Sequence, residues 1–176
     1  LHDRLAQPGG YRILAIGLAA PGPILFSKGR IAYNLTTFPG WERINILHEF
    51  ESEFGIPFYY DHDANTGALA EWKYGTFSRQ TGSLVYLSAS DGIGGGIVIN
   101  GKIQRGAQGF FGEIGHISID FNGARCGCGS RGCLDIYASC KRLTQEIKKA
   151  LPDHPDSILH STAKVNTGSI IEAVHK

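Results

Sequence analysis

The sequence predicts an α/β fold whose strands are at least partly parallel. Apolar runs at residues 11–19 and 56–60 have the length of buried strands. Segments with apolar residues at helical spacing follow each run, at residues 42–54 and 64–74. The order strand, helix, strand, helix is typical of βαβ units, whose strands are parallel.

The ends of these elements carry recognisable signals. Gly55 is a stop for the helix at 42–54, with Pro57 just beyond it. The helix at 64–74 follows two carboxylates, and either Asp63 or Asp61 suits its N-cap. Strand 11–19 runs into Pro21 and Gly22, which favour a tight turn.

The second half of the chain differs in its sequence pattern, with short strands and many glycines. A polar stretch at 78–82 suits a connection between two domains, residues 1–80 and 81–176. Strands are expected at 83–88 and 95–99, with a glycine-rich loop at 91–96 between them and the hairpin pair Asn100-Gly101 after them. Residues 106–132 hold eight glycines and are expected to be mostly loop, whereas 133–151 is helical in pattern.

Composition limits the function classes. The chain has 17 Lys and Arg against 16 Asp and Glu, so its net charge is +1, which argues against electrostatic binding of nucleic acid by this segment. Apolar residues make up 42%, enough for a core, yet no run reaches the roughly 18 residues of a membrane span. We therefore expect a cytoplasmic protein. The chain starts with Leu1 and contains no methionine, so we expect a piece of a longer protein.

Three cysteines form the sharpest motif. Cys126, Cys128 and Cys133 lie within eight residues among glycines, and His116 lies ten residues upstream. Three thiolates and one imidazole are a standard ligand set for tetrahedral structural zinc. The alternative is buried or disulfide-paired cysteines, although Cys126 and Cys128 are too close for an easy bridge. Cys140 is interpreted as a core residue.

Two carboxylates have both a structural and a functional interpretation. Asp63 ends a strand and opens a helix, where α/β proteins place ligand-binding groups, but a helix cap explains it equally well. Glu113 stands between Gly112 and Ile114, and is either a solvated loop charge or a functional group. The residues alone leave both alternatives open.

Five segments together resemble one family. They are residues 18–24 (LAAPGPI), 63–65 (DAN), 92–101 (GIGGGIVING), 112–116 (GEIGH) and the cysteine motif with Leu134-Asp135. In this order and spacing they resemble the ROK family of repressors, open reading frames and sugar kinases. The resemblance implies a two-lobed actin-like ATPase (ribonuclease H-like) fold and a hexose site between the lobes. It also implies zinc held by His116, Cys126, Cys128 and Cys133.

The resemblance assigns further roles by position. Asp63 matches the carboxylate that deprotonates the sugar hydroxyl in the kinases, a general-base role. Glu113 and His116 match residues that bind the other sugar hydroxyls. Asp135 stands where the family usually has a glutamate with that task, and His62 where it usually has an asparagine. The loop with Gly92, Gly94 and Gly95 matches the second phosphate-binding loop, which serves ATP and Mg²⁺ in the kinases.

Three departures favour the regulator branch. His62 and Asp135 replace the usual residues, and Asp91 adds negative charge where ATP phosphates would lie. We therefore expect a sugar-sensing effector domain, with a sugar kinase as the alternative. The expected partners are a monosaccharide or amino sugar and a second copy, as homodimer or homotetramer. DNA would be bound only through a module upstream of Leu1. The first phosphate loop of the family is also expected upstream of Leu1, and the adenosine-binding end of the second lobe is expected after Lys176.

Overall fold

The computed structural model describes residues 13–22, 24–25, 28–31, 39–76 and 82–175. The chain divides into two compact units, Leu1–Tyr86 with Gly96–Gly112, and Leu87–Gly95 with Glu113–Lys176. Each unit is described by itself. The expected connection at 78–82 lies almost wholly outside the described residues, and the assignment of 1–80 and 81–176 to two lobes stays a prediction.

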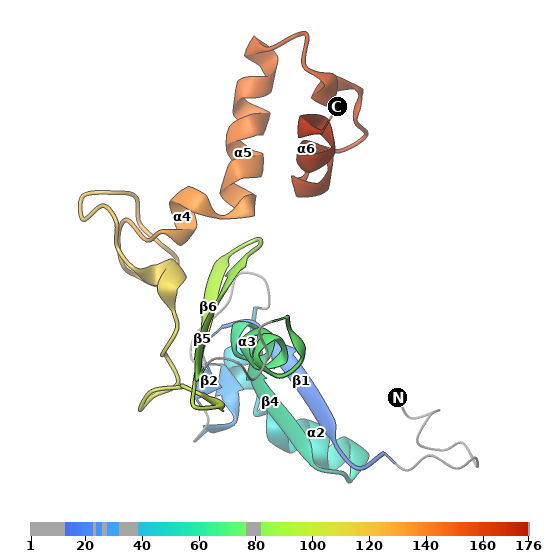
Figure 1. Cartoon of the computed structure of the whole chain (residues 1–176), viewed down its shortest axis with the longest axis vertical. Helices are drawn as coiled ribbons and strands as arrows, with labels where there is room; N and C mark the ends of the chain where they lie inside the picture. Colours follow the sequence, from blue (N-terminus) through green and yellow to red (C-terminus); the bar gives the residue numbers. More distant parts are fainter. Residues whose placement is uncertain (1–12, 23, 26–27, 32–38, 77–81, 176) are drawn as a thin grey trace. The chain divides into compact units, whose positions relative to one another are not determined.

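The first unit is built on a parallel strand pair. Strand β1 (Ile16–Ala20) pairs with β4 (Phe58–His62), so that Ala19 faces Asp61 and Ala20 faces His62 (Figure 1). A two-residue antiparallel pair, β2 (Ile24–Leu25) with β3 (Arg30–Ile31), lies in the same unit. Its buried core consists of Ala20, Ile24, Ile31, Ile46, Phe58 and Tyr60. The predicted parallel α/β arrangement is confirmed.

Two helices accompany these strands. A 3₁₀ turn at Trp41–Arg43 precedes α2 (Ile46–Phe54), which is capped by the Asn45 side chain and ends at Gly55 in the left-handed region (φ 63°). Helix α3 (Asp63–Tyr74) begins directly where β4 ends. Its N-cap is His62, with no side-chain cap bond, so the expected cap by Asp63 or Asp61 is wrong. The helix starts one residue earlier than the apolar pattern indicated.

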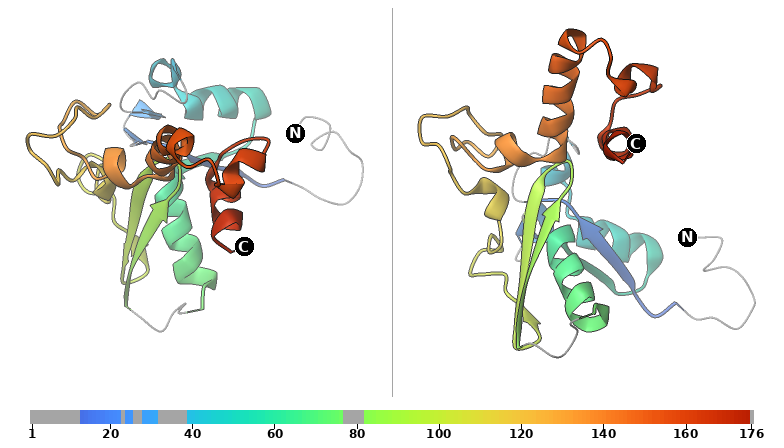
Figure 2. Two further views of the ribbon diagram at one scale, coloured as in Figure 1. Left: turned by 90° about the horizontal axis from the view of Figure 1, so that it is seen from above. Right: turned by 45° about the horizontal axis from the view of Figure 1, so that its top comes forward.

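The sheet β5–β6–β7 corrects the expected glycine loop. Strands β5 (Ser83–Ala89) and β6 (Ile93–Ile99) are neighbours (Figure 2). Asn100-Gly101, both with positive φ, turns β6 into β7 (Lys102–Ile103) as predicted. Only Ser90–Gly92 form the turn between β5 and β6; Gly94 and Gly95 belong to the strand. Gly96 explains why glycine suits a strand here: a Cβ would overlap the Ala64 carbonyl oxygen, so glycine permits close packing of β6 on α3.

The second unit combines the cysteine segment with helices. Residues 106–132 are mostly loop, as expected, with a 3₁₀ turn at Ile114–His116. The expected helix at 133–151 is two helices, α4 (Asp135–Ala138) and α5 (Cys140–Ala150), because Ser139 is extended and caps α5 through its hydroxyl. After 3₁₀ turns at Leu151–Asp153 and Ile158–Ser161, α6 (Thr167–Val174) contacts α5 (Figure 1).

Helix length bears on membrane insertion. In the part of the chain that the structure describes, no helix is both long and apolar enough to cross a bilayer.

Candidate functional site

His116 and three cysteines converge in the second unit. One ligand atom from each of His116, Cys126, Cys128 and Cys133 lies within 4.8 Å of all the others. His116 Nδ1 is 3.7 Å from Cys126 Sγ, and Cys128 Sγ is 3.7 Å from Cys133 Sγ. Tetrahedral zinc with Zn–S bonds of about 2.3 Å separates its sulfur ligands by about 3.8 Å. The cluster therefore has the donor set and spacing to hold a metal ion.

The backbone around the cysteines is a hairpin that brings them together. Gly132 N–H donates to the Ala124 carbonyl, and Cys126 N–H donates to the Ser130 carbonyl, both at 2.9 Å. Gly132 has φ +64°, and a Cβ there would overlap the Asp120 carbonyl oxygen, so only glycine fits. The glycines that make the segment look irregular in sequence are what allow this close return of the chain.

The sulfurs of the cluster differ in exposure. Cys126 and Cys133 are buried, whereas Cys128 is exposed. Burial, with hydrogen bonds to the other two thiols, raises the pKa of Cys133 to about 12. Without a cation this thiol keeps its proton at neutral pH, and a bound dication would displace it. Cys140 stands apart, partly buried at the start of α5, with its thiol 3.7 Å from the Ala89 carbonyl.

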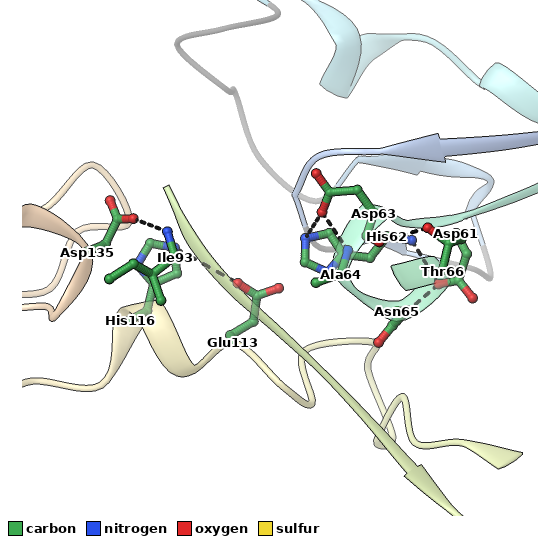
Figure 3. A network of polar contacts seen from close by, with 10 residues as sticks. All are labelled: Asp61, His62, Asp63, Ala64, Asn65, Thr66, Ile93, Glu113, His116 and Asp135. Atoms are coloured by element: carbon green, nitrogen blue, oxygen red, sulfur yellow. Dashed lines mark hydrogen bonds and ion pairs between the residues drawn. The ribbon is translucent and has the colours of Figure 1, made fainter. Parts of the chain in front are cut away.

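Asp63 lies at the first turn of α3 in the first unit, where it is 57% exposed (Figure 3). Its Oδ1 accepts from Ala64 N–H at 2.7 Å and lies 3.2 Å from Nε2 of His62, which is only 12% exposed. One carboxylate oxygen is thus held by the protein, and Oδ2 is left for an external donor. This arrangement suits a residue that accepts a hydrogen bond from a hydroxyl group.

A second carboxylate, Asp61, organises the same turn. Its Oδ1 accepts from His62 N–H at 2.8 Å and from Asn65 Nδ2 at 3.0 Å, while Oδ2 pairs with the guanidinium of Arg105 (Figure 3 shows the Asn65 contact). Asn65 belongs to the segment 63–65 (DAN) that the sequence motifs include, whereas no sequence motif indicated Arg105. Arg105 is 44 residues from Asp61 and follows β7, so only the fold of the sheet reveals the pair.

The remaining sugar-site candidates belong to the second unit. Glu113 Oε2 is 3.9 Å from His116 Nε2, the ring nitrogen opposite the one in the metal cluster. A carboxylate beside the outer nitrogen of a metal-binding histidine orients the ring. Asp135 Oδ1 accepts from Ile93 N–H at 2.7 Å (Figure 3). Both carboxylates are partly buried, and each has a polar contact within the second unit.

Asp91 lies next to cations as well as glycines. It lines a surface cavity of about 270 Å³ together with Lys141, Lys148 and Lys164 and the start of α6. The negative charge that the sequence placed at this loop is therefore accompanied by three positive charges from other segments. The lining suits an anionic ligand.

A model of the ROK family matches residues 2–176, almost the entire chain. The chain belongs to the ROK family. Among its curated relatives, a xylose repressor of Caldicellulosiruptor bescii is 40% identical over 139 residues, which are 78% of this chain and 34% of the repressor. A glucokinase of Halalkalibacterium halodurans is 38% identical over 149 residues, 84% of this chain and 44% of the kinase. The ROK chain thus spans less than half the length of these relatives.

A solved ROK structure supports the fold. A ROK family glucokinase from Streptomyces griseus, in complex with glucose and AMPPNP, superposes with a TM-score of 0.83 at 27% identity, over 94% of this chain and 55% of that chain. The resemblance seen in the motifs and the predicted actin-like ATPase fold are both confirmed. Repressors and kinases share this fold, so the fold alone does not choose between them.

Proposed function

We propose that this chain is a sugar-sensing effector domain of a ROK transcriptional regulator of carbohydrate metabolism. The observation that carries the proposal is its identity of 40% with a xylose repressor. The geometry of Asp63 agrees, because its Oδ1 is occupied by Ala64 and His62 while Oδ2 remains for a sugar hydroxyl. A pentose such as xylose is the first ligand to test.

The proposed sugar contacts are His62 and Asp63, at the β4–α3 turn, and Glu113, His116 and Asp135. Carboxylates and imidazoles are the acceptors and donors that a polyhydroxylated ligand needs. Sugar that binds one conformation more tightly shifts the population toward it, and this would change how the DNA-binding modules of a homodimer or homotetramer engage the operator. Such a regulator would work in the cytoplasm.

We also propose that the four-ligand cluster holds zinc. His116, Cys126, Cys128 and Cys133 would fill all four positions of the ion, which makes the site structural because none is left for substrate. Zinc would supply a fixed cross-link within a glycine-rich segment and would hold His116 beside Glu113. Metal analysis of the purified protein should give about one zinc per chain, lost in Cys128→Ser. A well-folded wild-type protein without metal would overturn this proposal.

Calorimetry tests the sensing function. The full-length protein should bind xylose or a related monosaccharide, and Asp63→Asn should weaken binding at least about tenfold, as expected when a charged acceptor is lost. Glu49→Gln, an exposed carboxylate change on α2, is the matched control and should leave the affinity unchanged. Sugar should also change the affinity of the protein for operator DNA in a gel-shift assay. Sugar binding with no effect on DNA binding would contradict the proposal that the protein is a regulator.

A sugar kinase is the second candidate, and the cavity beside Asp91 favours it. Three lysines that line this cavity with Asp91 suit ATP phosphates. In a kinase, the backbone of Gly92, Gly94 and Gly95 would contribute to phosphate binding, with Mg²⁺ as the counterion. Asp63 would accept the proton of the sugar hydroxyl while the oxygen of that hydroxyl bonds to the γ-phosphorus of ATP and ADP leaves. Saturable ATP-dependent phosphorylation of a hexose or N-acylhexosamine, abolished in Asp63→Asn, would establish this candidate and exclude a pure sensor.

A further inference from the structure

Ile93, the first residue of β6, is contacted by two segments far away in sequence. Its N–H donates to Asp135 Oδ1 at 2.7 Å, so this amide is bonded to a side chain. The Ile93 carbonyl oxygen lies so close to Gly115 that a Cβ there would overlap it. Both backbone polar groups of Ile93 are thus approached by residues of the same compact unit, Asp135 and Gly115.

The two covering residues flank the metal cluster. Gly115 immediately precedes His116, and Asp135 follows Cys133 by two residues. The segments are also bonded to each other, because Leu134 N–H donates to the Ile117 carbonyl at 2.9 Å and Ser118 pairs with Cys133. A metal that joins His116 to Cys133 therefore fixes the spacing of the two residues that cover Ile93.

The turn before Ile93 is attached to the same region. Ser90 N–H donates to the Gly92 carbonyl, and the Ser90 carbonyl accepts from Cys140 N–H, both at 2.9 Å. A Cβ on Gly92 would lie 3.1 Å from Asp135 Oδ1, so a side chain at this position would crowd the carboxylate. The turn Ser90–Gly92 is short and mostly exposed. The Ser90–Gly92 bond closes the turn itself, and the bond from Cys140 N–H attaches it to the start of α5.

We propose that Asp135 is a positioning residue that couples the metal cluster to the Ser90–Ile93 turn. Metal binding then fixes the turn through Asp135 and Gly115, and loss of the metal releases it. One oxygen of Asp135 serves this link, which leaves the other for a sugar hydroxyl. The coupling rests on the proposed zinc site, and it gives the metal control over the loop beside the lysine-lined cavity.

Hydrogen exchange measured by mass spectrometry tests the coupling in the full-length protein. In the zinc-loaded wild type, the Ile93 amide should exchange slowly. Asp135→Ala should accelerate it at least about tenfold, as expected for loss of a hydrogen bond to a carboxylate. Asp135→Asn keeps an acceptor oxygen and should retain most of the protection. Removal of zinc with a chelator should accelerate exchange of the Ile93 amide in the wild type. In Asp135→Ala, where exchange is already fast, removal of zinc should change the exchange rate little.

The controls separate this inference from the proposed zinc site. Val98, fully buried further along β6, should keep its protection in every variant and reports any general unfolding. Metal analysis before and after chelation shows whether zinc was present and released. If zinc leaves and Ile93 keeps its protection, the coupling is wrong although the zinc site stands. If no zinc is ever bound, both fail, and Asp135→Ala still tests the tie to Ile93 by itself.

Discussion

Replacing Arg105 with alanine would leave Asp61 without its cationic partner. Asp61 Oδ2 is paired with Nε and Nη2 of Arg105, and its Oδ1 holds the turn that carries Asp63 through His62 N–H and Asn65 Nδ2. The Asp61 side chain is 15% exposed, whereas that of Arg105 is 42% exposed. The substitution therefore uncovers a largely buried carboxylate at the base of the proposed sugar site.

The size of the effect lies between two known limits. Exposed ion pairs contribute about 0.2–1 kcal/mol, and removing one partner of a fully buried pair costs about 3–5 kcal/mol. Asp61 is mostly buried but keeps two neutral donors, and the guanidinium is partly solvated. We expect a coupling energy of about 1–2 kcal/mol between Asp61 and Arg105.

A double-mutant cycle measures this quantity. Urea unfolding of wild type, Asp61→Asn, Arg105→Ala and the double variant gives the coupling energy, and calorimetry with sugar gives the effect on affinity. Arg105→Lys should retain only part of the coupling energy with Asp61, because one ammonium group does not reproduce the two-nitrogen contact of the guanidinium. Sugar affinity should fall several-fold in Arg105→Ala, as the turn under Asp63 loosens.

Two results would refute this reasoning. A coupling energy below about 0.3 kcal/mol would mean that solvent screens the pair as it does an ordinary surface contact. A normal coupling energy with unchanged sugar affinity would mean that the pair stabilises the fold without positioning Asp63. In the second case the network around Asp61 would have a purely structural role.

Three further substitutions test local features of the fold. Gly96→Ala should destabilise the protein by about 1–3 kcal/mol in urea unfolding, because the added carbon overlaps α3, whereas Gly127→Ala, with open space around it, should be tolerated. Ser139→Ala should cost about 1 kcal/mol by removing the cap of α5, and Ser139→Asn should restore most of it. A hydrogen bond from Lys149 holds the pKa of Glu146 below its usual value, so the stabilisation is present above that usual value and is lost as pH falls through the lowered one. Carboxyl NMR titration should show the Glu146 pKa rising in Lys149→Ala, and an unchanged pKa would contradict this assignment.

Local signals predicted most elements because they depend on neighbouring residues. The stop at Gly55 and the hairpin turn at Asn100-Gly101 both need a left-handed backbone, and both have it. The cysteine motif converges because its ligands are close in sequence and glycines permit the return. These features are encoded by residues close together in sequence, which is the range that spacing and turn chemistry describe.

The errors arose where tertiary packing decided the outcome. The glycine-rich residues 91–96 suggested a loop before a strand at 95–99, but β6 already begins at Ile93, and Gly96 packs closely against α3. The helix expected at 133–151 is interrupted at Ser139, which is buried and caps the second part. Arg105, the cationic partner of Asp61, is 44 residues away, and Ile93, the partner of Asp135, is 42 residues away, so no local pattern indicated these two contacts.

The two unusual residues of the proposed sugar site share a physical consequence. His62 lies 3.2 Å from Asp63 Oδ1, and Asp135 gives its Oδ1 to the Ile93 amide. Each departure from the family pattern thus leaves one oxygen of a carboxylate engaged by the protein and one for a ligand. Carboxylates fixed in this way are good hydrogen-bond acceptors at little entropic cost, which is what recognition of a sugar requires. Phosphoryl transfer also requires a base that accepts a proton. Asp63→Asn should therefore separate the two functions, because sugar binding weakens in a sensor, whereas turnover is abolished in a kinase.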